Sequence, residues 1–136
     1  MIGVVIVTHG KIGAELVKAT EIMIGGQQKC ETVAVDNQTP DTLRNQIVKA
    51  IKAQEAGQGV LLLTDMFGGT PSNISLSFNE ADKIEVLTGL NLPLLIKIFG
   101  LRNKGEMDLK TLALTALDYA RKSINLASEM IKIRPK

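Results

Sequence analysis

The sequence is poor in residues on which several classes of protein depend. Aromatic residues make up 3% of the 136 residues, so the core has to be aliphatic, and no row of aromatic side chains can stack nucleic-acid bases. Sixteen basic and fourteen acidic residues leave a net charge of +2, which is too balanced for electrostatic binding to nucleic acid. We therefore expect no nucleic-acid partner.

Cysteine and histidine each occur once, as Cys30 and His9. A single cysteine allows no disulfide within the chain, which favours a reducing compartment. One histidine and one cysteine cannot build a conventional zinc site, so we expect no metal, and we expect no cofactor either. We interpret Cys30 as a small apolar filler of the core.

Long hydrophobic runs are also missing. The apolar segment 2–7 follows Met1 directly, without the basic region of a signal peptide, and is too short to span a membrane. We therefore expect a cytoplasmic protein with no direct membrane insertion.

Apolar residues nevertheless make up 45% of the chain, enough for a packed core. Short aliphatic runs predict buried strands at 2–7, 32–35, 60–63 and 84–87. Helical spacing of apolar residues, with Ile12, Leu16, Ala19 and Met23 on one face of the first helix, predicts helices at 11–24, 40–57, 92–99 and 109–120. This alternation predicts an α/β fold, with an open, mostly parallel sheet between two layers of helices. No linker, repeat or low-complexity tract interrupts the pattern, which indicates a single domain over residues 1–136.

The segment from Lys122 to Ala127 fits two structures. It can continue the last helix, or alternate as an edge strand through Ile124 and Leu126. Periodicity alone leaves both open.

Polar residues directly follow two of the predicted strands: Thr8 and His9 follow 2–7, and Thr64 and Asp65 follow 60–63. In open parallel sheets, ligands bind beyond the carboxyl ends of the strands, where the strand order reverses. If the two strands are neighbours, these side chains lie side by side. A carboxylate that accepts the hydrogen of one ring nitrogen leaves the lone pair of the other nitrogen free to attack. The alternative for His9 is a structural histidine without a chemical role.

A glycine turn follows Asp65, at Gly68 and Gly69. We expect Thr70 to cap a helix whose first residue is Pro71, with free N–H groups that attract an anion. The hydroxyl groups of Thr70 and Ser72 could add donors to phosphoryl oxygens. The alternative is a simple glycine turn and helix cap. Together with His9, the turn suits transfer of a phosphoryl group, because fixed donors stabilise the charge that spreads over its oxygens.

Competing chemistries lack their residues. The sequence has no Walker loop with its lysine, which leaves nucleotide hydrolysis unsupported. Phosphatases with a histidine nucleophile carry an arginine before it, where this chain has Thr8.

Three stretches carry a family resemblance: VIVTHG at 5–10, LLTDMFGGTPSN at 62–73 and TGLNLP at 88–93. They resemble the IIA domain of mannose-family sugar phosphotransferase systems, in register from Met1 to about Ala127. The resemblance implies a cytoplasmic carrier that takes phosphate from the carrier protein HPr and passes it to a IIB domain. It implies that His9 is phosphorylated, that Asp65 orients it, and that Thr70 belongs to the phosphoryl site, with the turn at 91–93 on the same edge.

The resemblance further implies a homodimer that exchanges an antiparallel strand near the C-terminus, which would make 122–127 a strand. Well-known members carry a fused IIB domain, whereas this chain ends at Arg134-Pro135-Lys136, so we expect a separate IIB partner. Two other functions stay open. One is the related phosphotransfer subunit of dihydroxyacetone kinase, and the other is a regulatory module switched by phosphorylation of His9.

Overall fold

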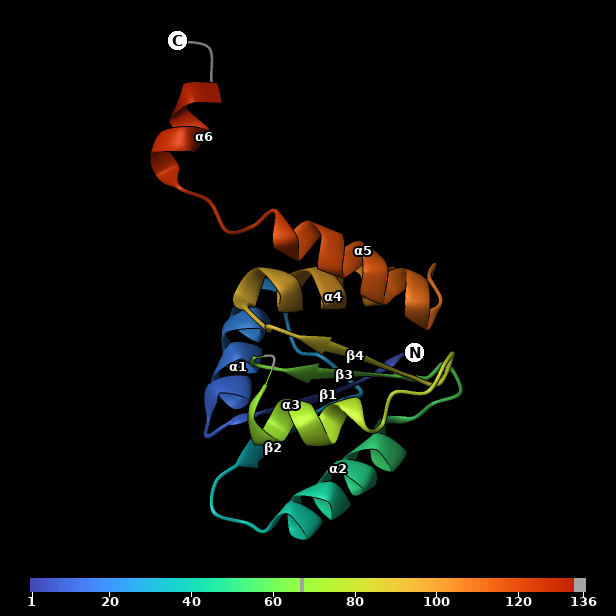
Figure 1. Cartoon of the computed structure of the whole chain (residues 1–136). Coiled ribbons are helices and arrows are strands. Elements are labelled where there is room, and N and C mark those ends of the chain that lie inside the picture. Colours follow the sequence, from blue (N-terminus) through green and yellow to red (C-terminus); the bar gives the residue numbers. More distant parts are fainter. Residues whose placement is uncertain (67, 134–136) are drawn as a thin grey trace.

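The computed structural model describes residues 1–66 and 68–133, without the side chains of Pro71, Lys132 and Ile133; Phe67 and residues 134–136 lie outside the described part. Four strands form one sheet, and helices cover both of its faces (Figure 1). The strands are β1 (Gly3–His9), β2 (Cys30–Val35), β3 (Val60–Thr64) and β4 (Ile84–Thr88). The helices are α1 (Ile12–Ile24), α2 (Pro40–Gln54), α3 (Gly69–Leu76), α4 (Leu92–Lys104), α5 (Leu109–Arg121) and α6 (Ala127–Ile133).

The sheet has the strand order β2-β1-β3-β4, and every neighbouring pair is parallel. The expected open α/β sheet is confirmed. From β1 the chain builds outward first on one side, to β2, and then on the other, to β3 and β4. The strand order therefore reverses between β1 and β3, and their carboxyl ends border the place where such sheets bind ligands.

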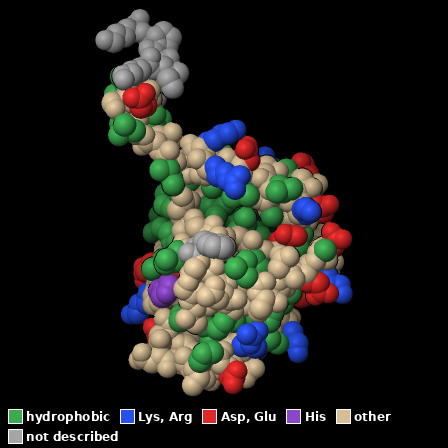
Figure 2. All heavy atoms as spheres, viewed as in Figure 1, with side chains coloured by type: hydrophobic (Ala, Val, Ile, Leu, Met, Phe, Trp, Pro, Cys, Tyr) green, Lys and Arg blue, Asp and Glu red, His purple; other side chains and the backbone are tan. Residues whose placement is uncertain are grey.

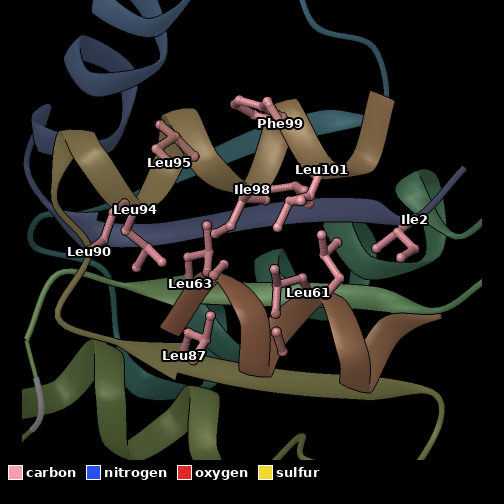
Figure 3. Close-up of a cluster of buried hydrophobic side chains, with 14 of the residues drawn as sticks. Ile2, Leu61, Leu63, Leu87, Leu90, Leu94, Leu95, Ile98, Phe99 and Leu101 are labelled. Atoms are coloured by element: carbon pink, nitrogen blue, oxygen red, sulfur yellow. The ribbon is translucent and has the colours of Figure 1, made fainter. Parts of the chain in front are cut away.

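Two hydrophobic clusters lie on the two faces of the sheet. On one face, Val4 and Ile6 of β1 pack with residues of α1, α4 and α5, part of which Figure 3 shows. On the other face, Val5 and Val7 pack with residues of α2 and α3. Because both faces are covered, every position of β1 before its last residue is buried, which explains the continuous apolar run in the sequence.

The fourth helix is longer than predicted. It continues past Phe99 to Lys104, because Leu101 and Arg102 still face the interior. The guanidinium of Arg102 is buried and donates hydrogen bonds from its two terminal nitrogens to three backbone carbonyl groups at the start of the sheet, whereas its Nε has no hydrogen-bond partner among the described residues. The helix ends where Gly105 adopts a left-handed conformation, with φ of +70°.

The first helix is rotated relative to its apolar pattern. Ile12 is 47% exposed and Met23 is 59% exposed, whereas Gly13 and Thr20 are buried. The backbone of Gly13 lies so close to the sheet that an added Cβ would be 2.8 Å from a methyl group of Ile6. The close approach at this glycine decides which face of α1 is covered.

The segment after α5 does not form the strand that the resemblance implies, because residues 122–126 contain no strand and α6 begins at Ala127. In Figure 1, α6 lies apart from the rest of the chain. Ile124 is 81% exposed and Leu126 is 68% exposed, so this apolar segment packs little against its own chain. A strand forms only where an edge pairs with it. Within residues 1–66 and 68–133, no helix is both long and apolar enough to cross a membrane.

Candidate functional site

His9 is the last residue of β1, and its side chain is 48% exposed. The chain turns immediately after it. Gly10 has a φ of +50°, and its backbone N–H donates to the carbonyl oxygen of Val35, at the end of β2, over 3.1 Å. A positive φ favours glycine, because it has no Cβ. The sheet therefore presents the imidazole at the surface of its carboxyl edge, where Figure 2 shows the histidine in purple.

Asp65 follows the last residue of β3, the other neighbour of β1. Its Oδ2 atom accepts two hydrogen bonds from His9, one from the backbone N–H at 3.1 Å and one from ring Nδ1 at 3.0 Å. The fold thus brings the two strand-end residues into direct contact.

This contact sets the state of both side chains. Asp65 is 11% exposed. Burial by itself would raise the pKa of Asp65, but the hydrogen bonds from the ring and the backbone of His9 outweigh it, and the pKa of the carboxyl group is lowered. An ionised carboxylate only accepts hydrogen bonds, so Nδ1 has to carry the hydrogen. The neutral ring therefore keeps its lone pair on Nε2.

The turn before α3 differs from the prediction. Gly68 and Gly69 have φ values of +88° and +79°, and α3 begins at Gly69 with Gly68 in the capping position. The expected cap at Thr70 is wrong, because Thr70 is the second helical residue and no side chain caps the helix. Two left-handed glycines turn the chain into the helix before Thr70 is reached. Pro71 is tolerated as the third residue, because first-turn N–H groups have no intrahelical partner. Phe67, which belongs to the same motif, is outside the described residues.

Gly68, Gly69 and Thr70 lie at the open start of α3, but Ser72 does not. Its side chain is fully buried, and its hydroxyl has no hydrogen-bond partner among the described residues. The other carboxylate oxygen of Asp65, Oδ1, is also enclosed without a described partner. The structure therefore does not bring the hydroxyl of Ser72 to the surface where a phosphoryl group could meet it. The helical turn directs this position inward, which the turn motif in the sequence does not reveal.

The loop after β4 borders the same edge. The N–H of Leu90 donates to the carbonyl oxygen of Thr64, at the end of β3, over 2.9 Å. Asn91 then caps α4, because its Oδ1 accepts the N–H of Leu94 at 2.9 Å. The turn at 91–93 is thus held beside the end of β3, as the resemblance implies.

Two exposed apolar side chains adjoin the site, and sequence reasoning missed them. Ile12 begins α1 three residues after His9, and Met66 follows Asp65, with exposed fractions of 47% and 53%. Met66 could have been predicted as an exposed residue of the site, because it is an apolar residue directly after the aspartate at the strand end. Nothing in the sequence indicated that Ile12 is exposed, because helical spacing places it on the same face as residues that are partly buried.

Two hollows of about 490 and 530 Å³ lie away from His9, bordered by Gly57 and Asp82, which precede β3 and β4 at the opposite edge of the sheet. In the described part of the chain, no group of three or more histidine, cysteine, aspartate or glutamate side chains is placed to hold a metal ion.

The protein is an open parallel α/β domain with an exposed histidine at the carboxyl ends of its strands, where the strand order reverses. A carboxylate holds the ring of this histidine by a hydrogen bond. Comparisons with known proteins agree with this description. The chain is 29% identical over 134 residues to the PTS system fructose-specific EIIA component of Bacillus subtilis, covering 97% of this chain and 90% of that protein. It is 31% identical over 98 residues to the PTS system mannose-specific EIIAB component of Escherichia coli K12, covering 71% of this chain and 30% of that longer protein.

A solved structure shows the same likeness. The phosphotransferase system component EIIA from Streptococcus agalactiae superposes with a TM-score of 0.83 at 28% identity, covering 95% of this chain and 99% of that one. The family model described as PTS system fructose IIA component matches residues 3–114. The chain belongs to this family, and the resemblance found in the sequence is confirmed. It is a IIA component, a phosphocarrier of the sugar phosphotransferase system.

Proposed function

We propose that the phosphoryl group is carried on Nε2 of His9. The observation that supports this most directly is the pair of hydrogen bonds to Oδ2 of Asp65, at 3.1 and 3.0 Å. They hold the hydrogen on Nδ1 and leave the nitrogen with the lone pair on the other side of an exposed ring. Asp65 acts by orienting the ring and by stabilising the positive charge that the ring acquires when Nε2 forms its new bond.

The transfer exchanges one phosphorus–nitrogen bond for another. The lone pair of Nε2 attacks the phosphorus of a phosphohistidine on the donor protein, and the donor imidazole leaves with the electron pair of the broken bond. The hydrogen on Nδ1 stays in place throughout. The onward step repeats this exchange with an acceptor side chain as the nucleophile. Gly68, Gly69 and Thr70 offer the backbone donors of the start of α3, and the hydroxyl of Thr70, to the equatorial oxygens.

We propose that the donor is HPr and that the acceptor is a separate IIB protein, with all three in the cytoplasm. The imidazole of His9 is 48% exposed, and two apolar residues close to His9 and Asp65 in the sequence, Ile12 and Met66, are exposed as well. A partner protein that covers these exposed side chains would exclude water during the transfer. We place the IIA domain over residues 1–136.

We further propose that the protein is a homodimer in which residues 122–127 pair antiparallel with β4 of the second copy. β4 is the last strand of the sheet order, and beyond Ile84, which forms an isolated antiparallel bridge with Glu80, its outer edge pairs with no other strand of the described residues. A hollow of about 410 Å³ runs beside it, lined in part by Val86, Thr88 and Ile124. Ile124→Asp should therefore give a monomer, because Ile124 is 81% exposed in one chain, while the control Ile22→Asp, at an 87% exposed position, should leave the dimer intact. A monomeric wild-type protein in light scattering would rule this assembly out.

The proposed role of His9 is tested with enzyme I, HPr and radiolabelled phosphoenolpyruvate. The wild-type chain should become labelled, and the label should be lost in acid but survive in base, as a phosphoramidate does. His9→Ala should abolish the label while the chain still folds, with a lower thermal stability because Asp65 loses the hydrogen bond from the ring. The control Gln58→Ala, at an exposed position on the opposite edge, should be labelled normally. Label that survives acid would instead point to a hydroxyl such as that of Thr70.

A second step separates transport from regulation. Onward transfer of the label to candidate IIB proteins supports the carrier role. A phosphorylated protein that transfers to none of them, but binds or releases another protein, would support a regulatory switch. Transfer within dihydroxyacetone kinase would support the related subunit.

A further inference from the structure

We propose that Thr8 is a positioning residue for phosphoryl transfer. Its hydroxyl accepts a hydrogen bond from the first turn of α1 and thereby fixes the turn in which His9 lies. The effect on the reaction rests on the proposed role of His9, whereas the effect on the ring itself does not. The contact is a buried hydrogen bond of 2.8 Å, in which the backbone N–H of Gly13 donates to Oγ1 of Thr8.

A strand does not require a hydroxyl at this position. Thr8 is 1% exposed and follows four valine and isoleucine residues in the same strand, so a valine would satisfy both strand preference and packing. The N–H of Gly13 does require an acceptor, because N–H groups in the first turn of a helix have no intrahelical partner. Without Oγ1, this buried donor would be left unsatisfied. The threonine therefore serves the start of α1 and not the strand.

Gly13 supports the same contact from the other side. A Cβ at this position would lie 3.1 Å from Oγ1 of Thr8 and 2.8 Å from a methyl group of Ile6. Glycine is a poor helix former, yet here it lets the backbone of the helix reach the hydroxyl. Gly13 thus departs from what a helix prefers, and Thr8 carries a hydroxyl that its strand does not need. Together they fix the distance at which α1 begins from the end of β1.

This distance controls the placement of the imidazole. Three backbone N–H groups anchor the short segment 9–13, each on a different partner. His9 donates to Asp65 at 3.1 Å, Gly10 donates to the carbonyl of Val35 at 3.1 Å, and Gly13 donates to Thr8 at 2.8 Å. If the third anchor is lost, the start of α1 can shift and rotate the turn, and Nδ1 then leaves its alignment with the carboxylate.

The ring can be observed directly, because His9 is the only histidine in the sequence. In protein with isotope-labelled histidine, nitrogen NMR reports which ring nitrogen carries the hydrogen, in buffer alkaline enough that the spectrum no longer changes with pH. We expect the wild type to show the hydrogen on Nδ1. In Thr8→Val the other tautomer should appear, and phosphoryl transfer from HPr should slow roughly tenfold or more, since a misplacement of about 1 Å can cost on the order of 100-fold.

Two further variants separate positioning from general stability. Thr8→Ser keeps the acceptor and should restore both the wild-type tautomer and the transfer rate. Thr20→Val is the matched control. Thr20 is a fully buried threonine of α1, and its hydroxyl donates to the backbone carbonyl of Leu16 over 2.9 Å, away from the site. The substitution should lower thermal stability without changing the tautomer. If Thr8→Val does not fold, Thr8→Cys takes its place, because a thiol is only a weak acceptor.

The proposal is overturned if the folded Thr8 variant keeps the wild-type tautomer and rate, or if Thr8→Ser behaves like Thr8→Val. A wild-type protein that is never phosphorylated would refute the proposed function of His9. The tautomer comparison needs no phosphoryl donor and would still decide whether Thr8 positions the ring.

Discussion

Replacing Asp65 by asparagine tests the reasoning about the site most directly. The substitution preserves the shape of the side chain but removes the negative charge. It also introduces an NH₂ group that can donate to Nδ1 and thereby favour the tautomer with the hydrogen on Nε2. In that tautomer the exposed nitrogen has no free lone pair.

The structure sets the size of the effect, because Oδ2 accepts two hydrogen bonds from His9. Only the bond from Nδ1 strengthens as the ring becomes positively charged, because the backbone N–H is not altered by the reaction. A hydrogen bond to a charged group contributes about 1.5–3 kcal/mol and one between neutral groups about 0.5–1.5 kcal/mol, so loss of the carboxylate charge raises the barrier by roughly 1–1.5 kcal/mol. Each 1.36 kcal/mol corresponds to a tenfold change in rate, so phosphorylation should slow by about 5- to 13-fold, and further where the ring adopts the other tautomer.

The assay is the initial rate of phosphoryl transfer from phosphorylated HPr, followed with radiolabel at equal protein concentrations. Asp65→Ala should also be slow but should retain some labelling, because His9 is still present while its ring is no longer held. Thermal unfolding of both variants controls for loss of structure. A wild-type rate in folded Asp65→Asn would refute the orienting role of Asp65.

Three other predictions concern the rest of the chain. Burial raises the pKa of the Cys30 thiol to about 11, although Arg102 opposes this, so at neutral pH alkylation of the native protein should be much slower than that of the unfolded chain; equal rates would contradict it. Leu95→Ala should lower the free energy of unfolding by about 2–5 kcal/mol, since Leu95 is fully buried, whereas Leu114→Ala, at a 56% exposed position, should change it by about 0.5 kcal/mol or less in denaturant titrations. The folded-state pKa of Asp65 is lowered, so its stabilising contribution is present above the ordinary aspartate pKa of about 3.9 and is lost as the pH falls through the folded value. Acid titrations should therefore show a weaker pH dependence of stability in Asp65→Asn than in the wild type.

Local pattern was sufficient for the strands, and the strand order of the structure then decided that β1 and β3 are neighbours. The aliphatic run in β1 signals a strand covered on both faces, because only such a strand needs apolar residues at every position. Polar residues at the ends of β1 and β3 had to lie at one edge once the strands were parallel neighbours, since parallel strands share their carboxyl ends. The contact between His9 and Asp65 follows from these two facts.

Turn and helix details were harder to predict. The start of α3 depends on the left-handed backbone at Gly68 and Gly69, which brings the chain into the helix before the threonine expected to cap it. Helical spacing grouped Ile12 with the apolar face of α1, but the close approach of Gly13 to the sheet rotated the helix and left Ile12 exposed. The close approach of Gly13 joins two segments that are separate in the chain and is possible because glycine has no Cβ. The spacing of apolar residues along the helix therefore does not predict it.

Residue preferences along the chain predict a parallel α/β domain with His9 and Asp65 at strand ends, because strand preference and burial are local properties. The packing of the elements settles which carboxylate oxygen contacts Nδ1, that Ser72 faces inward, and that residues 122–126 form no strand in a single chain. These features depend on where separate elements come to lie against one another, and a strand at the edge of a sheet exists only where another strand pairs with it.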